Sequence, residues 1–264
     1  MEPALRVAMA WLLFAAGHIG LAALPVRGAL VRRLGRWGFI AAYTAVASLT
    51  FALAIWTYAA QRLQGAPGLA LGRSGLAEVT LTSAVVLGVV LMLASFAGYQ
   101  RSPMSLTSGQ ASEPHGLARV TRHSFFVGVI LFAGAHALLA SRLAGAVGMA
   151  GLALFAAIGA WHQDRKLLAL RGESYQGYLA ATSVVPFAAI LAGRQRLVWR
   201  ELPLAGFAVG LVAAYLLRVA HAGIFDHGGA YVIGTVVGGA LLILVAELRR
   251  DRRERSPAAR RAAA

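Results

Sequence analysis

Residues 80–99 read TLTSAVVLGVVLMLASFAGY, a run of apolar and small residues without a charged side chain. An α-helix needs about 20 such residues to cross the hydrocarbon core of a bilayer. Similar runs recur along the chain and predict these spans: Ala4–Leu24, Trp37–Ala60, Thr80–Tyr99, His123–Ser141, Gly145–His162, Pro203–Ile224 and Gly229–Glu247. We therefore expect an all-α fold, a polytopic transmembrane helix bundle of about seven spans, with six also compatible.

Composition supports a membrane protein and excludes several other classes. Of the 264 residues, 59% are hydrophobic and 13% are charged, and the mean hydropathy is +0.68. Soluble domains have about 45–50% apolar and about 25% charged residues. The chain has no cysteine, which excludes disulfide scaffolds and thiolate chemistry. Its net charge of +15 would suggest nucleic acid in a soluble protein, but here it predicts contact with the lipid bilayer and no nucleic-acid partner.

The basic residues alternate between the loops. Loops after the first, third, fifth and seventh runs are rich in arginine: Arg27, Arg32, Arg33, Arg36, Arg101, Arg119, Arg122, Arg165, Arg171, Arg194, Arg196, Arg200, Arg249, Arg250, Arg252, Arg253 and Arg255. The positive-inside rule then predicts an N-terminus outside and a C-terminus in the cytoplasm. We assign this orientation to a bacterial cytoplasmic (inner) membrane. The predicted organisation is a bundle over residues 1–248, followed by a basic, disordered cytoplasmic tail over 249–264.

Residues 163–200 form an interfacial cytoplasmic segment in this interpretation. We expect a helix from about Asp164 to Leu170, a turn with the tyrosines, and then Val184–Leu191, which is too short to span and dips shallowly into the bundle. Asp164 and Arg165 would lie at the headgroup level, and Arg194 would anchor the exit near anionic lipid. A plain amphipathic linker is the alternative.

Two histidines lie inside predicted spans, where polar side chains are costly and often functional. His18 and His136 both have glycine and alanine neighbours, which would let a bulky group approach the backbone. Imidazole is a usual axial ligand of haem iron, although a hydrogen-bonded structural histidine is the alternative. The predicted depths of His18 and His136 in the bilayer differ by roughly 10 Å, calculated from a helical rise of about 1.5 Å per residue. Either helix tilt closes this gap, or only one of the two histidines binds the iron at a time.

The other histidines gather at the ends of the spans. His115, His123 and His162 form a cytoplasmic layer near Asp164, and His123 faces away from His136 on a straight helix. On the opposite side, His221, Asp226 and His227 could bind zinc, but a hydrated hairpin turn is the simpler interpretation.

Several motifs resemble a known family of membrane proteins. Gly17–Ala22, followed by basic residues, and Arg119–His123, leading to Gly128 and His136, are similar to the NnrU-like proteins. A longer pattern resembles the 15-cis-ζ-carotene isomerase branch of that family: Gly159–Trp161, Asp164–Leu167, Gly172–Glu173, Thr182–Ile190 and Gly193–Gln195. The similarity covers roughly residues 10–225.

This resemblance implies an integral membrane enzyme with haem b as its cofactor. The haem-iron ligands and catalytic residues would be His18 and His136, and His123 would also bind the cofactor. Independently of the resemblance, the apolar run between two basic clusters leads us to expect that Asp164, Arg165 and Arg194 support the ligands or form a lid over the cytoplasmic mouth of the haem cleft. The implied reaction is cis–trans isomerisation of the central 15-cis bond of 9,15,9'-tri-cis-ζ-carotene, a hydrophobic polyene of carotenoid biosynthesis.

The chain departs from the family pattern at two positions, and two other functions stay open. Ser124 replaces a frequent proline, and Gly134 stands where some relatives have a cysteine ligand. The family also includes accessory membrane haem proteins linked to denitrification through nitrite and nitric oxide reductase expression. A weaker resemblance through Arg122–His123, Gly172–Tyr178 and Pro186 is to isoprenylcysteine-type membrane methyltransferases, in which a helical cap binds S-adenosylmethionine.

Overall fold

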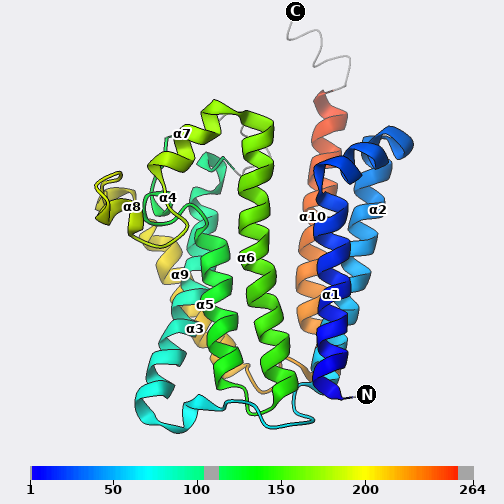
Figure 1. Cartoon of the computed structure of the whole chain (residues 1–264), viewed down its shortest axis with the longest axis vertical. Helices are drawn as coiled ribbons and strands as arrows, with labels where there is room; N and C mark the ends of the chain where they lie inside the picture. The colour runs from blue at the N-terminus through cyan, green and yellow to red at the C-terminus, as the bar shows by residue number, and fades with distance from the viewer. Residues whose placement is uncertain (1, 104–112, 255–264) are drawn as a thin grey trace, which may run out of the picture. The chain divides into compact units, whose positions relative to one another are not determined.

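A computed structural model describes residues 2–103 and 113–254, and within these residues the chain is helical without any strand (Figure 1). The predicted all-α class is confirmed. Helices over the apolar runs are α1 Pro3–Ala22, α2 Leu24–Gln61, α3 Gly75–Ser95, α5 Ser124–Leu139, α6 Leu143–Arg171, α9 Leu204–Val219 and α10 Ala230–Glu254. Shorter helices connect them: η1 Leu71–Arg73, η2 Phe96–Arg101, α4 Leu117–Val120, α7 Glu173–Ala181, α8 Ala188–Leu191, η3 Trp199–Glu201 and η4 Asp226–Gly229.

Five of these helical stretches are long and apolar enough to cross a membrane: Pro3–Ala22, Leu24–Gln61, Gly75–Tyr99, Leu143–Arg171 and Asp226–Ala246. The helices α5 and α9 are apolar but have only 16 residues each. At 1.5 Å per residue such a helix measures about 24 Å, against a hydrocarbon core of about 30 Å. The count of seven spans and the orientation of the termini stay predictions.

The chain divides into two compact units. The first consists of residues 1–11 and 61–221. In it, α9, α3, α5 and α6 pack side by side in this order (Figure 1). The closest approach joins α3 to α5: a Cβ on Gly88 would lie 2.6 Å from the Gly128 carbonyl oxygen, and one on Gly128 2.7 Å from the Gly88 oxygen. Small residues that let backbones meet are typical of membrane helix pairs.

The second unit consists of residues 12–60 and 222–264. Phe14 of α1 meets Phe51 of α2 edge to face, with ring centroids 5.5 Å apart. The long helix α2 is interrupted at Gly35, whose φ of 71° is accessible to glycine without strain. The part of α2 after this kink corresponds to the predicted span Trp37–Ala60. A tight turn precedes α10, with positive φ at Gly228 and Gly229.

The segment 163–200 differs from its predicted structure. Asp164–Leu170 is not a separate interfacial helix, because α6 continues without interruption to Arg171 and ends only at Gly172, which has a φ of 56°. The tyrosines of the expected turn lie in the helix α7.

The apolar stretch Val184–Leu191 does not dip into the bundle. Val185 is 65% exposed and Leu191 is 86% exposed, while Ala189 is buried. Ala189 is the only fully buried residue of this stretch, and Val184, Pro186, Ala188 and Ile190 are half-buried. At the C-terminus, α10 includes residues 249–254 of the predicted tail, and 255–264 lie outside the described residues.

Candidate functional site

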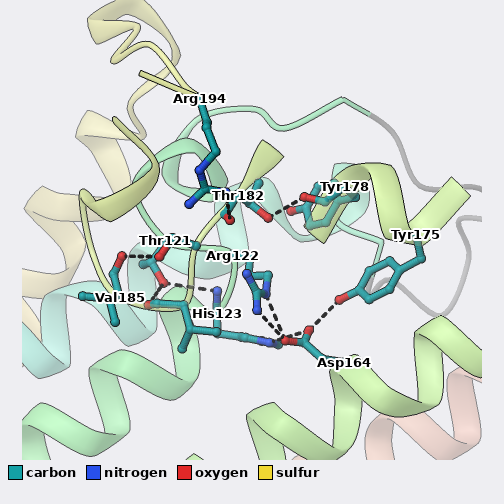
Figure 2. Close-up of polar contacts among 11 residues, drawn as sticks. Thr121, Arg122, His123, Asp164, Tyr175, Tyr178, Thr182, Val185 and Arg194 are labelled. Atoms are coloured by element: carbon teal, nitrogen blue, oxygen red, sulfur yellow. Dashed lines mark hydrogen bonds and ion pairs between the residues drawn. The ribbon is translucent and has the colours of Figure 1, made fainter. Parts of the chain in front are cut away.

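A cluster of polar side chains surrounds Asp164, near the C-terminal end of α6 (Figure 2). Arg122 and His123 reach it from the connection between α4 and α5, and Tyr175 reaches it from α7. The Arg122 guanidinium donates to Oδ2 of Asp164 from Nε and Nη2, each at 2.9 Å. His123 Nε2 lies 2.8 Å from Oδ1, and the Tyr175 hydroxyl donates to the same oxygen at 2.6 Å. One carboxylate thus joins α5, α6 and α7.

The hydrogen bonds assign the protons in this cluster. A carboxylate paired with a guanidinium accepts and does not donate, so Nε2 of His123 carries the hydrogen toward Asp164. Burial, followed by the hydrogen bond to Asp164, raises the pKa of Tyr175, which stays a protonated donor. Nδ1, the other nitrogen of the His123 ring, is also buried. Within the described residues this buried atom has no hydrogen-bond partner.

Backbone contacts attach the Arg122 connection to the segment that follows α7. The Thr121 hydroxyl donates to the Val184 carbonyl oxygen at 2.7 Å, and the Arg122 N–H donates to the Ser183 oxygen at 2.9 Å. The Phe187 N–H donates a third hydrogen bond, to the Val120 carbonyl oxygen at 2.9 Å. Three hydrogen bonds therefore join the two segments.

Arg194 fastens this segment from its other end. Its Nη1 donates to the carbonyl oxygens of Ala180 and Thr182, the latter at 3.2 Å (Figure 2). The Thr182 hydroxyl in turn donates to the Tyr178 oxygen at 2.6 Å. Arg194 thus contacts the protein's own backbone, and its predicted role as a lipid anchor stays a prediction.

A second ion pair joins Arg119 to Glu201, the last residue of η3, just before α9. Nε donates to Oε2 at 2.7 Å and Nη2 donates to Oε1 at 3.1 Å, while the Gly116 N–H donates to Oε2 at 2.8 Å. The hydrogen bond from Arg119 lowers the pKa of Glu201 to about 2. His115, predicted near Asp164, instead lies 3.9 Å from Glu201.

His136 lies in the second half of α5 and is held by its own helix. Its Nδ1 donates to the Phe132 carbonyl oxygen at 2.8 Å, which leaves Nε2 with the lone pair that binds a metal. The His221 ring lies 6.2 Å from the His136 ring, and the two planes differ by only 11°. A Cβ on nearby Gly134 would meet no atom within 4 Å. This pair fits the donor set of a haem-iron site, because imidazole is the usual nitrogen ligand of haem.

His18 lies in the second unit, on α1. Its Nε2 is 3.0 Å from the hydroxyl oxygen of Tyr43 on α2, and its ring packs near Phe14 with centroids 5.4 Å apart. His18 and His136 belong to different units, and their joint role in one haem site stays a prediction.

The remaining sequence candidates are not part of the Asp164 cluster. Arg165 is exposed, and its guanidinium lies 5.0 Å from the centre of the Trp161 ring. Within the described residues, no group of three or more histidine or acidic side chains is arranged to hold a metal ion, and so nothing supports the zinc alternative at His221, Asp226 and His227. Sequence reasoning missed Tyr43, Tyr175 and Glu201 as partners. Of these three residues, only Glu201 carried a signal in the sequence, because an acidic residue among basic loops suggests an ion pair.

Comparison with known proteins places this arrangement in a family. The family model described as NnrU protein matches residues 7–227. The chain belongs to the NnrU family. This NnrU chain is 40% identical over 82 residues to "15-cis-zeta-carotene isomerase, chloroplastic" of Zea mays, a match that covers 31% of this chain and 22% of the relative. It is 41% identical over 80 residues to the protein of the same name from Arabidopsis thaliana, which covers 30% and 22%.

The match thus spans less than a quarter of the length of either relative. No solved structure matches the NnrU chain.

The relatives correct the predicted location. Both are named as chloroplastic plant proteins, which contradicts the assignment to a bacterial cytoplasmic (inner) membrane. The physical reason is that arginine distribution reports on which side of a membrane a loop remains, and does not distinguish one membrane from another. The five long apolar helices still support a membrane protein.

Proposed function

We propose that this NnrU chain is a membrane isomerase that converts the central 15-cis double bond of 9,15,9'-tri-cis-ζ-carotene to trans. The observation that carries the proposal is the similarity to two proteins named as 15-cis-zeta-carotene isomerase, within a family match over residues 7–227. The long apolar helices support it, because a polyene hydrocarbon dissolves in the bilayer and reaches its enzyme from there.

The proposal includes haem b as cofactor, with His136 as an iron ligand and either His18 or His221 as the second. His136 is favoured because its backbone hydrogen bond leaves Nε2 ready to coordinate. His221 is already close and nearly parallel to it, whereas Nε2 of His18 faces the Tyr43 hydroxyl. When bound, ferrous haem would supply a metal centre that can interact with a polyene double bond and lower its rotational barrier.

The chain's own residues would position the site in this proposal. The carbonyl of Phe132 orients the His136 ring. The Asp164 cluster ties α5 to α6 and α7, so the helix that carries His136 is held from its N-terminal end. Asp164 and Arg194 hold residues 172–195 at the N-terminal end of α5, about 20 Å along the helix from His136, so this segment would act on the site through the position of α5.

The cofactor is tested by the absorbance of the full chain, purified in detergent from haem-replete cells. We expect a Soret band that is lost in His136→Ala and lost or shifted in His18→Ala or His221→Ala, whichever removes the second ligand. His227→Asn is the matched control, because asparagine tolerates the positive φ of 57° at this position. A folded, colourless preparation would overturn the haem proposal.

The reaction is tested separately by expression in cells that accumulate tri-cis-ζ-carotene in the dark, with chromatography of the isomers. We expect conversion to the 15-trans product, and its loss in His136→Ala. Asp164→Ala and Arg194→Ala should reduce haem retention or turnover without blocking membrane insertion. A protein that retains haem but leaves the carotene unchanged would contradict the isomerase and favour an accessory haem protein.

A further inference from the structure

The connection between α7 and α9 presents large apolar side chains on the surface of the first unit. Val185 is 65% exposed, Phe187 48%, Leu191 86% and Trp199 72%. The Leu191 N–H donates to the Phe187 carbonyl oxygen at 2.9 Å, so these two residues lie one helical turn apart. We call residues 185–191 the apolar loop. Exposed apolar side chains that follow one another closely are typical of a surface that contacts a protein or a membrane.

Phe187 holds the apolar loop in an unfavourable backbone conformation. Its φ of 64° lies in the left-handed region, which is costly for a residue with a bulky side chain. The hydrogen bond from its N–H to the Val120 carbonyl oxygen, 2.9 Å long, fixes the residue in this conformation. In water the exposed ring would add a second unfavourable contribution, whereas a surface that covers the ring would compensate for the first.

The apolar loop is attached at the depth where α5 begins. The carbonyl oxygens of Ser183 and Val184 accept hydrogen bonds from Arg122 and Thr121, which immediately precede α5. The helix α5 packs against α3 and α6, and both of these are long and apolar enough to cross a membrane. The start of α5, and the apolar loop with it, is therefore tied to the membrane-spanning part of the protein.

A tryptophan and an arginine on α6 indicate that this depth is the membrane–water interface. Trp161 is 58% exposed, and the Arg165 guanidinium lies 5.0 Å from the centre of its ring. Tryptophan is enriched at the interface, where its ring contacts lipid and its N–H contacts water. Asp164, about one turn after Trp161, binds Arg122 just before α5. The apolar loop therefore begins at the level of the lipid headgroups.

The charges beside the apolar loop are complementary to anionic lipid. Residues 174–200 contain three arginines and no acidic residue. Arg194 donates to backbone carbonyl oxygens, whereas Arg196 and Arg200 are exposed. Each of these two is adjacent to a residue that accepts a hydrogen bond from Arg119, which keeps both near the start of α5. Guanidinium groups at this depth can bind the phosphate groups of lipids.

We propose that the apolar loop inserts into the boundary between headgroups and acyl chains of the bilayer, and that Arg196 and Arg200 bind phosphate groups of anionic lipids in the same leaflet. Val185, Phe187 and Leu191 contact the acyl chains. Segments that lie in the interface place their apolar side chains below the headgroups and their arginines among them. The proposal is independent of the isomerase and of haem.

The depth of the apolar loop is measured with nitroxide spin labels on single cysteines, because the chain has none of its own. Val185→Cys and Leu191→Cys are labelled in the full chain, in vesicles of phosphatidylcholine and phosphatidylglycerol. Molecular oxygen dissolves among acyl chains, whereas a polar nickel chelate stays in water. We expect both labels to collide more often with oxygen than with the chelate.

Ser174→Cys provides the matched control. Ser174 is exposed at the start of α7, which lies further along the axis of α6 than α8 does (Figure 1). We expect its label to collide more often with the nickel chelate, as a residue in water does.

Two results would overturn the proposal. More frequent collisions with the chelate at 185 and 191 would place the apolar loop in water. Protection of both labels from both reagents would show a protein interface instead, and disulfide cross-linking of Leu191→Cys would then identify a second copy of the chain as the partner.

The double variant Arg196→Gln/Arg200→Gln tests the contact with headgroups. In the parent, adding phosphatidylglycerol to phosphatidylcholine vesicles should raise the ratio of inserted to water-exposed label at 191, by about fivefold for each arginine. The double variant should lose this rise. Arg73→Gln, which changes an exposed arginine in η1, should retain it. A rise that persists in the double variant would overturn the assignment of the phosphate contacts.

Discussion

His123 and His136 lie at the two ends of one helix and are held in different ways. His123 precedes α5, is 2% exposed, and bonds to a carboxylate on α6 that also binds Arg122 and Tyr175. His136, half-buried near the other end, bonds to a carbonyl one turn earlier in its own helix. The first histidine therefore belongs to a network that joins three helices, whereas the hydrogen bond of the second is to its own helix.

This difference suggests that His123 contributes to the stability of the fold and that His136 is available to bind a ligand. The charged groups at the start of α5 are tolerated because each has a partner. Removing one of them leaves the others without that partner in a partly buried place, which is costly. A histidine held by its own backbone can offer its free nitrogen to a ligand without disturbing the packing. Changes at the Asp164 cluster should therefore act through the fold, and reduce haem retention only by that route, whereas changes at His136 should act on the cofactor directly.

The largest effect is expected for Asp164→Ala, which leaves the Arg122 charge and two hydrogen-bond donors without their acceptor. The two side chains of the pair are 14% and 13% exposed, so breaking it should cost up to about 3–5 kcal/mol, the value for a fully buried pair, measured as the free energy of unfolding in detergent by circular dichroism. The neighbouring Arg165→Ala removes an exposed contact with Trp161 and should cost about 1 kcal/mol or less. Equal costs for the two variants would contradict the assigned network.

The contact between α3 and α5 should be the next most sensitive feature. Gly128→Ala places a Cβ 2.7 Å from the Gly88 carbonyl oxygen, which must separate the helices at a cost of about 1–3 kcal/mol. Gly134→Ala, on the same helix but in open space, should be neutral or slightly stabilising. Thermal unfolding of both variants measures the two effects. A lower melting temperature for Gly134→Ala than for Gly128→Ala would contradict the expectation.

His136→Ala should change stability far less than Asp164→Ala, because it removes one hydrogen bond within a helix, about 0.5–1.5 kcal/mol. The comparison is made on haem-free protein, so that ligand binding does not add to the stability of the parent. A loss as large as that of Asp164→Ala would show that His136 supports the fold as His123 does.

The smallest effect concerns the Arg119–Glu201 pair, which lies nearer the surface. The pKa of Glu201 is lowered to about 2 from 4.5, so its contribution is fully present above about pH 4.5 and is lost as the pH falls toward 2. Glu201→Gln should therefore be less stable than the parent at neutral pH and should approach it on acidification. A constant difference from pH 6 to pH 2 would contradict the pair.

The amino-acid sequence by itself determined the all-helical membrane class and the seven apolar helices, to within a few residues at most ends. These are local properties, because length and hydropathy of a run decide whether a helix is buried in lipid. Sequence also selected His18 and His136, since imidazoles in apolar runs are conspicuous, and it placed His123 and Asp164 on one side of the bundle.

Only the tertiary structure decided the partners of these groups. Glu201 lies 82 positions from Arg119, and Gly88 lies 40 positions from Gly128, at distances along the chain where no local pattern reports a contact. The tertiary structure also showed that Val185, Phe187 and Leu191 of the apolar stretch are exposed, and it brought His221 next to His136. Hydrogen bonds and close backbone contacts depend on how helices pack and rotate against one another, which hydropathy along the chain does not specify.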